Sequence, residues 1–203
     1  KSFSTRRVAA IQKGKTIFTL SCSWQKQEAG LAHSQPIPDV LPPEALRGDL
    51  ETFKALLTDE QDINRFAFRF EAIDSRSVER TNLGDGETHP PYKNTWLKVR
   101  EPLTDEPWVH LGLLAYMSDL DFMSTSMLPH GREKLRGGIQ GASLDHSIWF
   151  HRPFRADQWL LFVKESPHAG GGRGFIRGKF FSRTGELVAT AAQECLIRPV
   201  KTT

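Results

Sequence analysis

Residues 107–122 constrain this chain more than any other segment, because their sequence, PWVHLGLLAYMSDLDF, predicts a helix without a polar face. A helix that is apolar on nearly all sides is normally buried inside a larger structure. Asp119 stands near its carboxyl end, where burial and the negative end of the helix dipole would both disfavour the charged form. We therefore expect a central buried helix, with Asp119 either a general base or a carboxylate that caps the helix and points to water.

The composition is that of an ordinary globular protein, with 38% hydrophobic and 25% charged residues and a net charge of +3. No block of like charge favours nucleic acid as a partner, and no apolar run is long enough to span a membrane. The start of the chain lacks the order of a signal peptide. Two cysteines, Cys22 and Cys195, are too few for a disulfide framework or a metal site built on cysteine. We expect a soluble intracellular protein.

The remaining pattern predicts many strands and little helix. Helical spacing of apolar residues predicts a second helix over residues 43–58, and residues 25–40 have the composition of a linker. Residues 80–91 predict an exposed loop and residues 124–138 an irregular segment. Strands are predicted at 2–11, 16–24, 66–73, 94–99, 143–150, 158–165, 175–181 and 186–198. A helix followed by successive antiparallel strands predicts an α+β fold in which a curved sheet wraps the helix.

The two ends of the chain resemble each other. At each end a glycine turn leads into a long apolar strand, and 171 residues separate Gly14 from Gly185. This similarity suggests an internal repeat. We interpret residues 1–24 as the carboxyl-terminal hairpin of an incomplete first repeat, 25–65 as a linker with a helix, and 66–203 as a complete second repeat that carries the site. On this interpretation the chain lacks the amino-terminal part of the first repeat.

The last predicted strand contains one unexpected polar residue. With alternating side chains, Gln193 shares a face with the apolar residues at 187, 189, 191, 195 and 197. A buried amide without partners costs about 1–3 kcal/mol, so Gln193 must have a polar neighbour. A structural amide is the ordinary explanation. The repeat places Cys22 at the equivalent position, however, and an amide present in one copy only favours a functional site.

Several motifs outside that strand contain side chains that could take part in catalysis or bind a ligand. Alternation over 143–150 places Asp145 and His146 on opposite faces, so they cannot form a dyad, and His146 is best explained as a core histidine with one hydrogen bond. His146 and His151 also diverge, which argues against a two-histidine metal site. No Gly-x-Ser-x-Gly motif is present. The glycine-rich segment at 170–174 predicts a surface turn, although Arg173 and bare N–H groups could also hold a phosphate.

Several of these segments together resemble the acyl-CoA thioesterase II (TesB-like) family. They are SDL at 118–120, GASLDHSIWFHRPF at 141–154, AQE at 192–194 and SFSTRRV at 2–8. The resemblance implies a double hotdog fold, in which each of two repeats is a long helix wrapped by an antiparallel sheet. It also implies a site in the second repeat made of Asp119, Ser143 and Gln193, with serine where the family often has threonine.

The implied activity is hydrolysis of a medium- or long-chain fatty acyl-CoA by direct attack of water, without a metal or other cofactor. The CoA part of the substrate is expected near Arg173, Gly172 and Gly174. A homo-oligomer and a peroxisomal or cytoplasmic location are further expectations from the family. Two alternatives stay open: a hydratase or dehydratase of the same fold, although Asp119 has no histidine three or four residues away, and a non-catalytic acyl-CoA-binding or scaffold protein.

Overall fold

The computed structural model describes residues 2–56, 70–79, 87–131 and 138–200. The chain divides into two compact units, Lys1–His33 and Ser34–Thr203. The first unit contains an antiparallel hairpin of β1 (Phe3–Gln12) and β2 (Lys15–Gln25). Gly14, at φ 76°, supplies the left-handed conformation that its tight turn requires. The two predicted strands at this end are therefore confirmed to within a residue or two.

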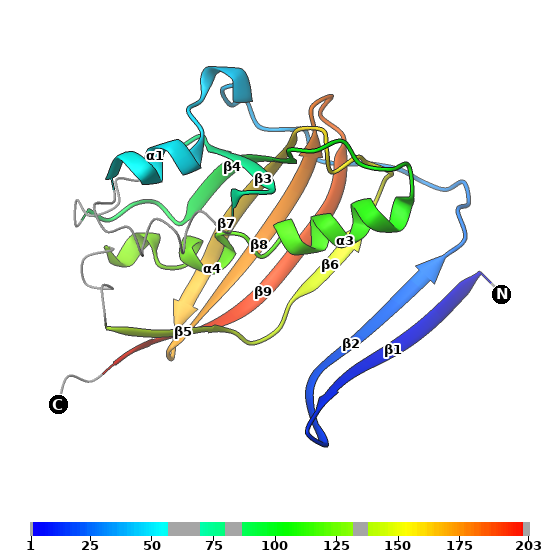
Figure 1. The fold of residues 1–203 in the computed structure, drawn as a ribbon, viewed down its shortest axis with the longest axis horizontal. Coiled ribbons are helices and arrows are strands. Elements are labelled where there is room, and N and C mark those ends of the chain that lie inside the picture. The colour runs from blue at the N-terminus through cyan, green and yellow to red at the C-terminus, as the bar shows by residue number, and fades with distance from the viewer. Residues whose placement is uncertain (1, 57–69, 80–86, 132–137, 201–203) are drawn as a thin grey trace. The chain divides into compact units, whose positions relative to one another are not determined.

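The second unit is built on a sheet that is antiparallel throughout its described residues. Its order is β3-β4-β7-β8-β9-β5, and β6 pairs with β9 beside β5 (Figure 1). The strands are β3 (Ile73–Ser77), β4 (Tyr92–Val99), β5 (Ile139–Ser143), β6 (Ser147–Phe150), β7 (Leu160–Gly170), β8 (Arg173–Ser182) and β9 (Leu187–Pro199). This arrangement confirms the expected α+β class with an antiparallel sheet.

Helices α3 (Pro107–Met117) and α4 (Phe122–Thr125) lie against one face of this sheet (Figure 1). Leu114, Met117 and Phe122 are fully buried and pack into the main hydrophobic core with side chains from β7, β8 and β9. The Phe162 ring occupies the space where a Cβ of residue 178 would be, so Gly178 leaves room for that ring in the core.

The predicted central helix is shorter and more exposed to solvent than its sequence indicated. It ends at Met117 rather than at 122, because residues 118–121 form a turn in which Asp121 has a left-handed φ of 56°. Only one face of α3 is buried: Trp108 is 70% exposed and Tyr116 50% exposed. An apolar sequence predicts burial, but among the described residues of the second unit nothing covers the face of α3 that points away from the sheet.

The opposite face of the sheet carries a second, smaller core. Leu46 packs there with Trp96, Leu161 and Phe181. The helix predicted over 43–58 is divided into a 3-10 turn (Pro43–Ala45) and α1 (Asp49–Leu56), because Leu46 points into this core and the chain turns at Gly48. Residues 57 and 58 of that prediction lie outside the described residues.

Three strand predictions need correction. Strand β3 begins at Ile73, where the strand predicted over 66–73 was to end; residues 66–69 lie outside the described part. Strand β7 continues to Gly170 rather than stopping at Glu165, because a register shift between Glu165 and His168 accommodates Pro167. The single strand predicted over 143–150 is interrupted: Ser143 is the last residue of β5, residues 144–146 are not in a strand, and β6 begins at Ser147.

Three smaller predictions concern the side-chain alternation in β9 and two segments between strands. The side chains from Ala189 to Ile197 alternate as predicted, but Leu187 packs on the opposite face, after a register shift between Phe180 and Phe181. Residues 87–91, the described part of the predicted loop over 80–91, contain no helix or strand. The segment 124–138 is less irregular than predicted, since it includes the end of α4 and a 3-10 turn (Leu128–His130), while 132–137 lie outside the described residues.

Candidate active site

Three separate parts of the second unit meet at the edge of the sheet. Asp119 lies in the turn after α3, Ser143 is the last residue of β5, and Gln193 lies in β9. Ser143 pairs with Cys195, whose side chain is in the main core, so Ser143 and Gln193 are on the face of the sheet that α3 covers. The strand register and the turn after the helix thus bring these residues together.

A short chain of hydrogen bonds connects the three side chains. Gln193 Nε2 donates to Ser143 Oγ at 3.0 Å, and Ser143 Oγ donates to Asp119 Oδ1 at a long 3.5 Å. Gln193 is fully buried, whereas Ser143 and Asp119 are exposed. A buried amide therefore holds a hydroxyl and a carboxylate at a place that water and a substrate can reach.

The exposure of Asp119 corrects one expectation. Its side chain was expected at the end of a buried helix, but it stands two residues beyond α3 and faces solvent. The case for Asp119 depends instead on its contact with Ser143.

His146 is the residue that sequence reasoning placed wrongly. It is exposed rather than buried in the core; its Nδ1 is hydrogen-bonded to Gln193 Oε1, and its Nε2 lies 2.7 Å from Ser118 Oγ. The ring also packs edge-on against Phe122, with 5.8 Å between centroids. Alternation failed because β5 and β6 are separate strands, and residues 144–146 between them do not follow the pleat. No sequence signal marked this break.

The glycine-rich turn connects β7 and β8. Arg173 pairs with Leu196 in the strand register, opposite to the face that carries Gln193, and forms an ion pair with Glu194 at 3.2 Å. A Cβ on Gly174 would collide with Ser126, so close packing explains that glycine, and Gly172 has the left-handed φ of 76° that suits the hairpin turn. Among the described residues, no hydrogen bond or ion pair joins Arg173, Gly172 or Gly174 to Asp119, Ser143 or Gln193.

Buried charges lie close to the site in sequence and structure. Lys93 forms a salt bridge with Asp121, and the fully buried Lys164 donates to Thr95 at 3.1 Å. Burial lowers the pKa of Lys164 to about 8. Burial would raise the pKa of the Asp121 carboxyl, but Lys93 and Lys164 outweigh it and hold that pKa below its usual range. Among the described residues, no hydrogen bond or ion pair joins Lys93, Asp121 or Lys164 to Asp119, Ser143 or Gln193.

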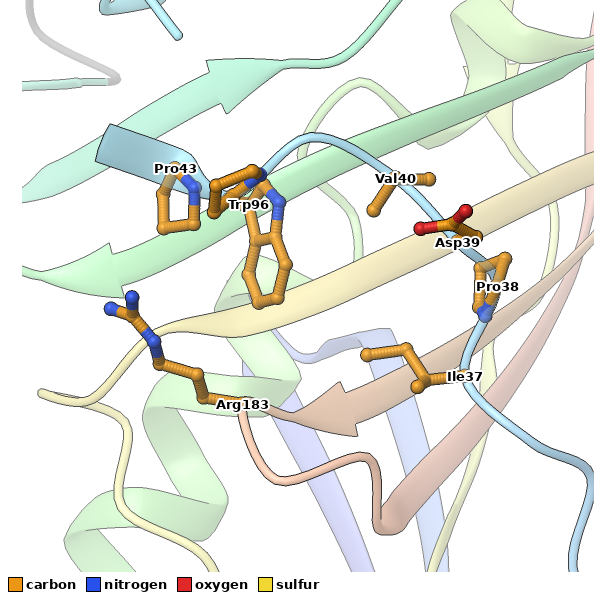
Figure 2. A pocket seen from close by; sticks show the side chains of 8 residues that line it. Ile37, Pro38, Asp39, Val40, Pro43, Trp96 and Arg183 are labelled. Atoms are coloured by element: carbon orange, nitrogen blue, oxygen red, sulfur yellow. The ribbon is translucent and has the colours of Figure 1, made fainter. Parts of the chain in front are cut away.

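Neither the buried Cys195 nor a pocket on the opposite face of the sheet forms part of this site. Burial raises the pKa of the Cys195 thiol, which disfavours a nucleophilic thiolate. A pocket of about 380 Å³ lies on the opposite face of the sheet, where the Trp96 ring and the Arg183 side chain face the segment from Ile37 to Pro43 (Figure 2). Within the described ranges, no cluster of three or more histidine, cysteine or acidic side chains could hold a metal ion, and no helix has the length and apolarity to cross a membrane.

The chain is similar to known thioesterases along almost its whole length. A family model described as acyl-CoA thioesterase matches residues 63–196. Acyl-coenzyme A thioesterase 8 of Rattus norvegicus is 38% identical over 206 residues, which cover 97% of this chain and 64% of that protein. This chain therefore spans somewhat less than two thirds of that relative.

Solved structures give the same result for the fold. Acyl-CoA thioesterase II TesB2 from Mycobacterium marinum matches with a TM-score of 0.79 and 39% identity, over 98% of this chain and 70% of that one. A conserved hot dog fold protein from Alicyclobacillus acidocaldarius matches with a TM-score of 0.73 and 15% identity, over 98% of this chain and 68% of that one, which shows the fold alone. The resemblance seen in the sequence is thus confirmed: the chain has the hotdog fold and belongs to the acyl-CoA thioesterase family.

Proposed function

We propose that this protein hydrolyses medium- or long-chain fatty acyl-CoA to a free fatty acid and CoA, with Asp119, Ser143 and Gln193 as its catalytic residues. One observation carries the proposal: Ser143 Oγ lies within hydrogen-bond range of both the Asp119 carboxylate and the Gln193 amide. Two groups that reach the same hydroxyl are close enough to share a water molecule beside it. A base, a hydroxyl and an amide donor around one water are the groups that direct hydrolysis requires.

The reaction follows from the roles of these groups. Asp119 accepts a proton as water adds to the thioester carbonyl carbon, which forms a C–O bond and a tetrahedral oxyanion. Gln193 has two amide hydrogens; one is directed at Ser143, and the second is free to stabilise the oxyanion. The C–S bond then breaks, and the CoA thiolate takes the proton from Asp119. No residue forms a covalent bond with the acyl group.

A hydratase or dehydratase is less well supported. Such chemistry uses a histidine paired with a carboxylate, and His146 is the one histidine that the described residues bring into contact with the site. Both of its ring nitrogens are already hydrogen-bonded, to Gln193 and Ser118. A ring that is held at both nitrogens has no free atom for proton transfer to an enoyl substrate.

The test is a comparison of products. Release of free thiol from palmitoyl-CoA, together with incorporation of a single ¹⁸O from labelled water into the fatty acid, is the expected result. Hydration of an enoyl-CoA without thiol release would support the hydratase, and tight acyl-CoA binding without any turnover would support a binding protein. Trapping of an acyl group on the protein by rapid quenching would contradict direct attack of water.

The proposal also covers the assembly of the protein and its location in the cell. Among the described strands β6 pairs with β9 alone, and its Trp149 is 55% exposed, which suits edge-to-edge pairing of hotdog sheets in a homo-oligomer or with a first repeat. A soluble protein of the peroxisome or the cytoplasm fits the family. Recognition of the CoA phosphates by Arg173, Gly172 and Gly174 also stays a prediction, and the ion pair between Arg173 and Glu194 weakens it.

A further inference from the structure

His146 contacts Gln193, one of the proposed catalytic residues, and an inference about its role rests on the function proposed above. Its Nδ1 contacts Gln193 Oε1, while Gln193 Nε2 contacts Ser143 Oγ. The histidine therefore touches the end of the amide that faces away from the reacting atoms. It lies in the short break between β5 and β6, and the edge-on contact with Phe122 limits rotation of the ring.

The position of the imidazole proton and the orientation of the amide depend on each other. A carboxamide has a donor end and an acceptor end, and the group that faces one end determines which end faces the other side. If Nδ1 of His146 carries a hydrogen, it donates to Gln193 Oε1 and the NH₂ group is directed at Ser143. If Nδ1 is bare, the amide must turn over and present its carbonyl oxygen to Ser143.

Counting hydrogens distinguishes these two arrangements. With Nδ1 protonated, His146 donates to Gln193, Gln193 donates to Ser143, and Ser143 donates to the Asp119 carboxylate. Each of these three donors then has an acceptor, and the chain ends on an anion, the strongest acceptor available. With the amide reversed, the Ser143 hydrogen goes to Gln193, and no hydrogen remains between Ser143 and Asp119.

Ser118 contacts the other nitrogen of the ring. Its Oγ lies 2.7 Å from His146 Nε2 and 2.7 Å from the Ala115 carbonyl oxygen. When the hydroxyl donates to Nε2, the neutral ring must carry its hydrogen on Nδ1. When the hydroxyl donates to Ala115 instead, Nε2 carries a hydrogen, and a doubly protonated ring keeps a second hydrogen on Nδ1. The amide orientation is the same in these two states, whereas a neutral ring with its hydrogen on Nε2 alone would reverse it.

We infer that His146 is a positioning residue: by keeping a hydrogen on Nδ1 it fixes the Gln193 amide with its NH₂ group toward Ser143 and the substrate. It acts through Gln193 and does not touch the reacting atoms. A histidine in this role controls turnover without contributing to substrate binding.

Three variants test the inference by their effect on thioester hydrolysis. His146→Leu should lower kcat about tenfold with KM unchanged within about twofold, because one orienting hydrogen bond is lost. His146→Asn should recover most of that loss, since its amide nitrogen can occupy the place of Nδ1. His151→Leu is the matched control: His151 also bonds to β9, through Thr190 at 3.0 Å, and should leave kcat unchanged. Wild-type kcat in His146→Leu, or equal losses in the Leu and Asn variants, would overturn the inference.

A double variant separates positioning from a general structural role. In a Gln193→Ala background, His146→Leu should cause no further loss beyond about twofold, because the residue through which it acts is gone. A further tenfold loss in that background would show an independent role for His146.

Nitrogen NMR of labelled histidine in the wild-type protein tests the inference without activity. We expect the His146 signals of an Nδ1–H neutral ring or of an imidazolium; a neutral ring protonated on Nε2 would overturn the inference. If the wild-type protein releases no thiol from acyl-CoA, the proposed function fails whatever the NMR result. If it does, and Asp119→Asn is inactive while His146→Leu is not, only the positioning role fails.

Discussion

The β1–β2 hairpin and the β8–β9 hairpin have the same construction but different surroundings. Each turns at a glycine with positive φ, Gly14 at 76° and Gly185 at 88°. Each also has a register shift at the same place, where Ile17 of β2 and Val188 of β9 are passed over in the pairing. These two residues are 171 positions apart, the spacing that the sequence repeat predicts. The shared irregularity supports the proposed duplication better than the glycine turns alone.

The difference between the hairpins shows what a site requires. Side chains of β1 and β2 are exposed or at most half-buried, whereas Ile176, Phe180 and Val188 of the second hairpin are fully buried beneath the helices. Cys22 and Gln193 occupy equivalent positions. Gln193 belongs to the proposed site because β5 and the turn after α3 bring Ser143 and Asp119 beside it. The hairpin is a scaffold, and the neighbouring segments supply the chemistry.

The largest effect is expected from removing the Asp119 carboxylate, since the strands of the first hairpin contain no carboxylate. Asp119→Asn should reduce turnover of palmitoyl-CoA at least about a hundredfold, the scale of a lost general base. The melting temperature should change little, because the side chain is exposed. Thiol release and a thermal melt on the same sample measure both. Near wild-type hydrolysis in a folded Asp119→Asn protein would exclude Asp119 from the mechanism.

The next largest effect is expected when Gln193 is replaced by cysteine, the residue at the equivalent position 22 of the first hairpin. Gln193→Cys removes the donor to Ser143 and the acceptor for His146, so we expect turnover to fall about a hundredfold, as for loss of an oxyanion donor. Gln193→Glu is the matched control for packing, since it keeps the size and loses the donor. Both variants should be impaired in thiol release; full activity in either would mean that the amide is only structural.

These predictions depend on residues that the sequence located to different degrees. The hairpins, the antiparallel sheet and the helical segment followed from alternation and spacing, because local periodicity determines which face of an element is apolar. Asp119, Ser143 and Gln193 came from resemblance to a family, and the structure then placed them together. Period-two alternation did identify Gln193 as a polar residue on an apolar face.

His146 and the exposure of α3 could not be predicted in this way. The side of the sheet to which His146 turns depends on a break between β5 and β6 that is three residues long, which alternation cannot detect. The burial of α3 depends on what covers it, and an apolar sequence states only that covering it would be favourable. Both are properties of tertiary packing rather than of local sequence.

A third prediction compares the buried charges of the second unit with the exposed charges of the first. Since burial lowers the pKa of Lys164 to about 8, the unfolded chain binds one more proton than the folded protein between about pH 8 and the normal lysine pKa near 10.5. The free energy of unfolding should therefore rise with pH in this window, by at most about 1.4 kcal/mol per pH unit.

Urea denaturation at several pH values measures that slope. Lys164→Met should remove this contribution, whereas Lys15→Met, at an exposed position of β2, should leave the slope unchanged. Equal slopes for the wild-type protein and the Lys164→Met variant would contradict a lysine that loses its proton more readily in the folded state.

The smallest expected effect is also the sharpest test of the comparison. Cys22→Ala should leave turnover unchanged within about twofold, because the described partner of its thiol is the Arg6 carbonyl oxygen at 3.8 Å, too long to be a strong contact. Cys22→Gln, which gives the first hairpin the amide of the second, should likewise not rescue Gln193→Cys, because the strands of the first hairpin contain no carboxylate that could act as the base. A large loss of thiol release in folded Cys22→Ala, or recovery of activity in the Cys22→Gln, Gln193→Cys double variant, would mean that both hairpins contribute to catalysis.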